Sequence, residues 1–158
     1  MKVTINKNPA LDDDYINVKY RELNSAVSRI IEICKEGKQT MLVAWEDRKY
    51  QIDVNDIFYI EWVDGHSCIC TEENVYTSPQ TLAQIAEQLN SKEFIRISKP
   101  MVVNIRKVKW ISSVMNMKLM AKLTNGERVV ISRHYREDML KAIFAMGKEI
   151  KNEKVNSK

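Results

Sequence analysis

Residues 94–108 form the sequence FIRISKPMVVNIRKV, and the class of fold follows from this segment. Apolar residues recur along it at the alternating spacing of strands that pack on a hydrophobic core. Four cations, Arg96, Lys99, Arg106 and Lys107, are interleaved with them, and the segment contains no carboxylate. We therefore expect the apolar residues to anchor the segment to the core, and the cations to have no carboxylate nearby.

The charges of the rest of the chain are divided unevenly. Residues 46–93 contain three Lys or Arg and ten Asp or Glu, whereas residues 94–158 contain fifteen and five. A basic half of this kind predicts a polyanion or an acidic protein as the partner. Double-stranded DNA and docking on an acidic protein both remain open at this point. RNA is less favoured, because the strands show no pattern of exposed aromatic side chains for stacking on bases.

Several classes of function lack support in the sequence. The 158 residues suit one ordinary domain with a small appendage, and they contain no glycine-rich phosphate loop and no nucleophile or zinc-protease motif. Cys34, Cys68 and Cys70 do not have the spacing of a zinc site and are expected to be reduced thiols. Without these motifs we expect a protein that is not an enzyme and has no metal and no cofactor. No signal peptide or long apolar run is present, so we also expect a cytoplasmic protein without membrane insertion.

Hydrophobic periodicity predicts a mainly β fold with few helices, of the α+β class, built from small antiparallel sheets. Two dipeptides, Asp64-Gly65 and Asn125-Gly126, predict tight hairpin turns. Helices are expected over residues 22–36, 78–90 and 132–150, with Ser78 and Ser132 as N-caps of the last two. Strands are expected over residues 1–5, 15–20, 40–45, 49–54, 56–63, 66–71, 74–78, 109–114, 119–124 and 128–132 and within 94–108.

These elements predict three parts of the chain. Residues 1–38 form a strand–strand–helix extension, too small to fold alone, which we expect to serve dimerisation or partner binding. Residues 39–150 form the main domain, and residues 151–158 a disordered basic tail.

Three segments in order resemble the LytTR family of DNA-binding domains. The family pattern F-x-R-x-H/S-K/R-S-x-x-V-N is matched by Phe94, Arg96, Ser98, Lys99, Val103 and Asn104. Asn125-Gly126 and then Val130-Ile131-Ser132-Arg133-His134-Tyr135 match the pattern that leads into the family's last helix. Upstream, DIFYIEWVDGHSCICTEENVY resembles the family's segment of paired strands. The resemblance covers about residues 40–146.

The resemblance implies that loops of a β scaffold enter successive major grooves of DNA. It implies base contacts from His66, Lys99 and Arg133, and further DNA contacts from Ser67 and His134 in the same loops. Arg and Lys can donate to the O6 and N7 acceptors of guanine, which fits this role. Arg106, Lys107 and Arg136 suit phosphates, which position a protein without specifying sequence.

Three other residues of this segment are interpreted separately. Pro100 departs from the family, which often has Ser there, so a phosphate contact from that position is lost and Lys99 is biased toward an extended backbone. Asn104 is interpreted as a buried residue that bonds to the backbone. Arg96 has two open interpretations, as a DNA contact or as an ion-pair partner of a carboxylate in the acidic middle segment.

The family resemblance also implies a biological role. We expect a bacterial, sequence-specific transcription regulator, similar to response regulators but of the stand-alone type without a receiver domain. It would bind two half-sites as a homodimer, and a small membrane protein could be its regulatory partner. The alternative is a protein–protein interaction module that docks its basic face on an acidic partner.

Overall fold

A computed structural model describes residues 16–35, 39–90 and 92–147 of the chain. The chain divides into two compact units, Met1–Lys38 and Gln39–Lys158.

The first unit contains helix α1, Ser25–Lys35. The helix starts three residues later than expected, because Asn24 caps it: its Oδ1 accepts a hydrogen bond of 3.0 Å from the backbone N–H of Val27. The strand predicted over residues 15–20 is wrong for residues 16–20, which have no regular secondary structure. A strand requires a neighbour for its backbone hydrogen bonds, and the described part of this unit offers none. The strand predicted over residues 1–5 lies outside the described residues.

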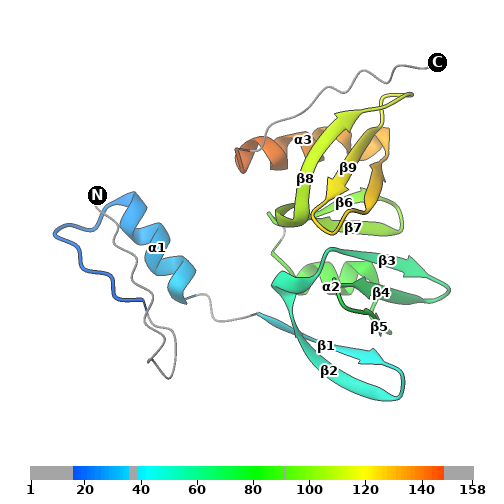
Figure 1. Cartoon of the computed structure of the whole chain (residues 1–158), viewed down its shortest axis with the longest axis horizontal. Coiled ribbons are helices and arrows are strands. Elements are labelled where there is room, and N and C mark those ends of the chain that lie inside the picture. The colour runs from blue at the N-terminus through cyan, green and yellow to red at the C-terminus, as the bar shows by residue number, and fades with distance from the viewer. Residues whose placement is uncertain (1–15, 36–38, 91, 148–158) are drawn as a thin grey trace. The chain divides into compact units, whose positions relative to one another are not determined.

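The second unit is built on two antiparallel sheets, which confirms the mainly β class (Figure 1). The larger sheet has the strand order β2-β1-β5-β4-β3-β7-β6, and the smaller has the order β10-β9-β8. The strands of the larger sheet are β1 (Thr40–Trp45), β2 (Arg48–Asp53), β3 (Tyr59–Val63), β4 (His66–Cys70), β5 (Val75–Ser78), β6 (Phe94–Ser98) and β7 (Met101–Asn104). Those of the smaller sheet are β8 (Val108–Ser113), β9 (Leu119–Leu123) and β10 (Arg128–Ile131).

The first hydrophobic core lies between the larger sheet and helix α2, Leu82–Gln88. Residues 78–90 were predicted to be helical throughout with Ser78 as the cap, which is wrong at the start. Ser78 is the buried last residue of β5, and Thr81 caps the helix instead. Thr81 and Gln84 form a reciprocal capping box, with hydrogen bonds of 3.3 and 2.9 Å between backbone N–H groups and side-chain oxygens.

The second hydrophobic core joins the smaller sheet to β6, β7 and helix α3, Arg136–Ala145. Val102 faces the first core and its neighbour Val103 faces the second, because adjacent side chains of a strand point to opposite sides. Phe94 and Ile97 are likewise divided between the two cores. The segment 94–108 is therefore apolar on both faces because it lies between two cores.

The last helix also begins later than expected. β10 ends at Ile131, and a 3₁₀ turn, η3 (Arg133–Tyr135), precedes α3. Ser132 makes no side-chain capping bond; its backbone N–H instead donates to the carbonyl of Ile97 at 2.9 Å. This hydrogen bond ties the end of β10 to β6, so the α-helix can start only after the turn. Residues 148–150, the predicted end of this helix, lie outside the described residues.

No helix in the described part of the chain is both long enough and apolar enough to cross a lipid bilayer.

Candidate nucleic-acid interface

Two hairpin turns lie side by side at one end of the larger sheet. β3 pairs antiparallel with both β4 and β7, so the β3–β4 turn and the β6–β7 turn share that end. The backbone N–H of Trp62 donates to the carbonyl of Pro100 at 2.7 Å and links the two turns directly.

A third turn, Ser132–Tyr135, reaches the same end through the hydrogen bond from Ser132 to Ile97 near the end of β6. In Figure 1 the β3–β4 turn lies on the right-hand side of the second unit. We refer to the turns Asp64–Gly65, Lys99–Pro100 and Ser132–Tyr135 together as the turn edge.

The first turn of the edge has the geometry predicted from its Asp-Gly dipeptide. Asp64 and Gly65 have φ angles of 48° and 84°, and Val63 pairs with His66 across them. His66 is half-buried at the start of β4. Ser67, however, is completely buried, and its hydroxyl donates to the carbonyl of Gln80 at 2.8 Å. The predicted DNA contact from Ser67 is therefore wrong, because side chains alternate along the strand and this one points into the core.

The second turn is held by Arg96. Its Nε donates to the carbonyl of Ser98 at 3.2 Å, and its Nη2 donates to the carbonyl of Lys99. Of the two interpretations left open for Arg96, the ion pair with the acidic segment is wrong, since the guanidinium spans the turn. Sequence reasoning missed this positioning role, although an arginine two residues before the end of its strand was the available signal. The side chain of Lys99 is exposed.

The third turn presents Arg133 and His134, both exposed. The His134 ring packs edge-on against Tyr135, with ring centroids 4.9 Å apart. Arg136 is half-buried, and its Nη1 lies 3.4 Å from the carbonyl oxygen of Met117, in the turn between β8 and β9. Arg136 is thus adjacent to the turn edge.

The cations of the turn edge have no carboxylate partner among the described residues. The only ion pair in the described ranges joins Arg106 Nη2 and Glu93 Oε1, which are 2.5 Å apart. The expectation that the cations of residues 94–108 lack a carboxylate is therefore wrong for Arg106. Glu93 lies just outside the segment in sequence, and the folding of β6 against β7 brings it to Arg106.

Arg106 and Lys107 are not brought to the turn edge. They belong to the 3₁₀ turn η2, Ile105–Lys107, which follows the far end of β7. Lys107 Nζ lies over the ring of Phe58, 4.9 Å from its centroid. The predicted phosphate contacts of these two residues do not fit this placement, because the turn edge lies at the opposite end of the same strand.

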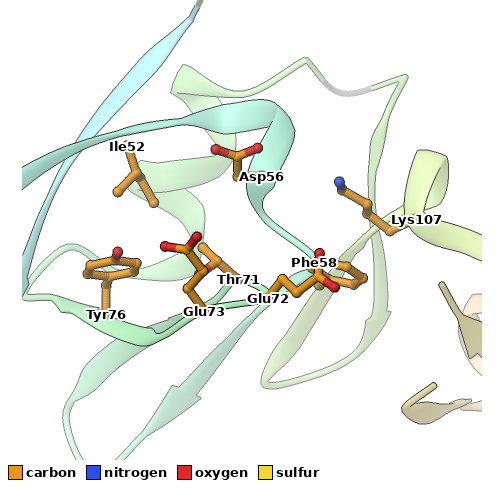
Figure 2. Close-up of a pocket in the computed structure, with 8 residues that line it drawn as sticks. All are labelled: Ile52, Asp56, Phe58, Thr71, Glu72, Glu73, Tyr76 and Lys107. Atoms are coloured by element: carbon orange, nitrogen blue, oxygen red, sulfur yellow. The ribbon is translucent and has the colours of Figure 1, made fainter. Parts of the chain in front are cut away.

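The end of the sheet at which η2 lies is acidic. A cavity of about 240 Å³ is lined there by Asp56, Glu72, Glu73 and Lys107, among others. Figure 2 shows the three carboxylates and the Lys107 side chain around this hollow. In the described part of the chain, no cluster of three or more His, Cys, Asp or Glu side chains could hold a metal ion. The carboxylates would repel a phosphate backbone, so this end of the sheet is unsuited to DNA.

Asn104 is buried, with 1% of its surface exposed, and bonds to backbone groups as predicted. Its Nδ2 donates to the carbonyl of Ile57 at 2.9 Å, and its Oδ1 accepts from the N–H of Arg106 at 3.0 Å. It therefore fixes the path of η2 and takes no part in the turn edge.

A β scaffold whose turns gather cations at one end is typical of the class of loop-based nucleic-acid binders. Comparison with known families makes the class specific: residues 47–144 match the model of the LytTr DNA-binding domain. The chain belongs to this family of DNA-binding domains. Family membership, rather than any absence in the structure, also establishes that the domain is not an enzyme.

The chain is similar to bacterial regulators. It is 26% identical over 125 residues to the sensory transduction protein LytT of Bacillus subtilis, covering 79% of this chain and 52% of the relative. It is 31% identical over 115 residues to LytT of Enterococcus faecalis, covering 73% and 48%, and 25% identical over 125 residues to the transcriptional regulatory protein LytR of Staphylococcus aureus, covering 79% and 51%. The chain thus spans about half the length of the curated relatives it matches.

A solved structure from Bacillus cereus, described as a LytTr DNA-binding domain, shares the fold. It superimposes with a TM-score of 0.64 and 24% sequence identity over 68% of this chain and 98% of that one. The likeness confirms the fold expected from the resemblance in sequence.

Proposed function

We propose that the turn edge contacts the bases of an operator in the major groove through His66, Lys99 and Arg133. The observation that carries this proposal is that three turns from distant parts of the chain meet at one end of the sheet, with cations that lack carboxylate partners among the residues that the structure describes. Arginine can donate two parallel hydrogen bonds to guanine, lysine can donate one, and histidine can donate to a base or a phosphate. His66 directly follows the first turn, and the other two turns contain Lys99 and Arg133.

The other cations near the edge are proposed to orient the domain. Arg136 and His134 flank Arg133 and are in reach of the same stretch of phosphate backbone. Such contacts add affinity that is independent of sequence and falls steeply with salt. We leave Arg106 out of the proposed interface because it pairs with Glu93, and Lys107 because it lines the acidic cavity.

For the whole protein we propose a transcription regulator that acts on DNA in the cytoplasm, in keeping with the names of its relatives. We further propose that the first unit mediates homodimerisation, so that two domains bind two half-sites. Leu23 and Ile33 are 63% and 62% exposed on or beside α1, and a second copy of the unit would cover them. Ile33→Glu should then give a monomer that keeps its affinity for a half-site but loses affinity for the full operator. A wild-type chain that is monomeric in light scattering would exclude dimerisation and favour a membrane protein as the partner of this face.

The proposed contacts are tested by selecting bound sequences from a random duplex pool at two salt concentrations. Wild type should enrich a motif of two half-sites, and Arg133→Ala should relax one position in each half-site, where a base contact is worth about 1–3 kcal/mol. Arg106→Ala is the matched control, since it removes an arginine from the opposite end and should leave the motif unchanged. If no motif emerges and binding only fades with salt, the basic surface is nonspecific and an acidic protein becomes the better candidate partner.

A further inference from the structure

The turn between β8 and β9, residues 114–118, is tight and strained. The N–H of Val114 donates to the carbonyl of Lys118 at 3.0 Å, and the N–H of Lys118 lies 3.4 Å from the carbonyl of Met115. Asn116 and Met117 have φ angles of 60° and 58°. Asparagine tolerates this left-handed conformation, but methionine does so only at a cost in free energy.

Two apolar side chains project from this turn into solvent. Met115 is 84% exposed and Met117 is 70% exposed, and only one residue separates them. The domain gains little stability by burial of either side chain, and Met117 has the unfavourable positive φ. Strain combined with exposed apolar surface indicates a contact with another molecule.

The turn is continuous with the turn edge. Ser113 pairs with Leu119, and Leu119 pairs with Ile131, so the β8–β9 turn lies beside the end of β10, where the Ser132–Tyr135 turn begins. The guanidinium of Arg136 reaches from the start of α3 to the carbonyl of Met117. Figure 1 shows the tip of this hairpin beyond the start of α3, on the same side of the unit as the other turns.

We propose that Met115–Lys118 is a fourth DNA-contacting turn, which places a methionine as a wedge at a base step beside the operator contacts of Arg133. Apolar side chains in other DNA-binding proteins enter the minor groove, partly unstack a base step and bend the duplex. Duplex DNA fits better than an apolar protein surface, because the methionines are flanked by Lys118 and Arg136, whose charges suit the phosphates on either side of such a step. This inference rests on the proposed base contacts of the turn edge.

The test uses the full chain and the duplex selected by wild type. The double variant Met115→Ala/Met117→Ala should bind about tenfold more weakly and bend the duplex less in a fluorescence energy-transfer assay. Its salt dependence should be unchanged, since no charge is lost. Lys118→Ala should instead reduce the steepness of the log–log salt plot by about one unit. Phe144→Ala is the matched control, because Phe144 is also exposed, at 64%, but lies near the other end of α3.

A second readout is independent of affinity. Peroxide should oxidise Met115 and Met117 in the free protein and spare them in the complex, as measured by peptide mass spectrometry. Wild-type affinity and bending in the double variant, or full oxidation in the complex, would overturn the wedge while leaving the three-turn interface intact. Unchanged DNA binding with loss of reporter transcription would overturn it as well and assign the turn to a protein partner. Failure of wild type to bind any duplex specifically would overturn both proposals.

Discussion

The two ends of the larger sheet carry similar residues in opposite surroundings. At the turn edge, Lys99 and Arg133 project from tight turns with no carboxylate partner in the described ranges. At the other end, Arg106 pairs with Glu93, and Lys107 lies over Phe58 beside the acidic cavity. Residues 94–108 contribute cations to both ends, because β6 and β7 run between them. A basic residue at a strand end is therefore available to DNA only if no carboxylate pairs with it.

Charge reversal at the two ends should give the largest difference. Arg133→Glu should lower operator affinity by about 3 kcal/mol or more, since a base contact of about 1–3 kcal/mol is lost and a carboxylate then faces phosphate. Arg106→Glu should change affinity only slightly. Fluorescence anisotropy on the selected duplex measures both, and equal losses for the two variants would mean that both ends contact DNA.

Asn104→Ala should have the next largest effect, on stability rather than on binding. The change leaves the carbonyl of Ile57 and the N–H of Arg106 without their buried partner, which should cost about 2–3 kcal/mol of unfolding free energy in urea. Asn125→Ala is the matched control, because its hydrogen bonds to Glu127 are local and less buried. The folded fraction should bind DNA normally. Weakened binding by fully folded protein would tie this end of the sheet to the interface.

Arg96 allows a finer test of the turn edge. If it positions Lys99 by binding the carbonyls of the turn, Arg96→Ala should weaken binding by about 1 kcal/mol, and the loss should largely vanish when Lys99 is already alanine. Arg96→Lys should rescue little, since an ammonium group cannot span two carbonyls as the planar guanidinium does. Additive losses in the double-mutant cycle would show instead that Arg96 contacts DNA by itself.

The smallest expected effect concerns pH. Burial raises the pKa of the Cys70 thiol, and burial also raises the pKa of the neighbouring Tyr59 hydroxyl. Above roughly pH 8.5 the unfolded chain loses protons that the folded state keeps. The free energy of unfolding is therefore unaffected by these groups below that pH and falls as the pH rises above it. Urea unfolding at pH 7.5 and pH 10 should show this fall, and Cys70→Ala should reduce it. Stability that rises over this range would contradict the assignment.

Local signals predicted much of the fold correctly. Asp64 and Gly65 both have positive φ in the first predicted turn, and Gly126 has positive φ in the second. A tolerance for positive φ is visible in a dipeptide, so both turns could be predicted. The start of α2 was misplaced because Ser78 and Thr81 are both good caps, and only pairing of β5 with β4 commits Ser78 to a strand.

The partners of the cations could not be predicted in the same way. Glu93 reaches Arg106, and Arg96 reaches the carbonyl of Lys99, only after β6 has folded against β7. The residues of the candidate site followed from the family resemblance. Their division between two ends of a sheet required the register of the strands.

The hydrogen bond from Ser132 to Ile97 also bears on how the protein is made. The Ser132–Tyr135 turn is the last part of the turn edge to be synthesised, and it is held in place by a strand synthesised well before it. A nascent chain that ends within the smaller sheet would display Lys99 without Arg133 and would have no complete surface for an operator. Specific binding should therefore arise in one step, when translation has passed α3, rather than grow with the length of the chain.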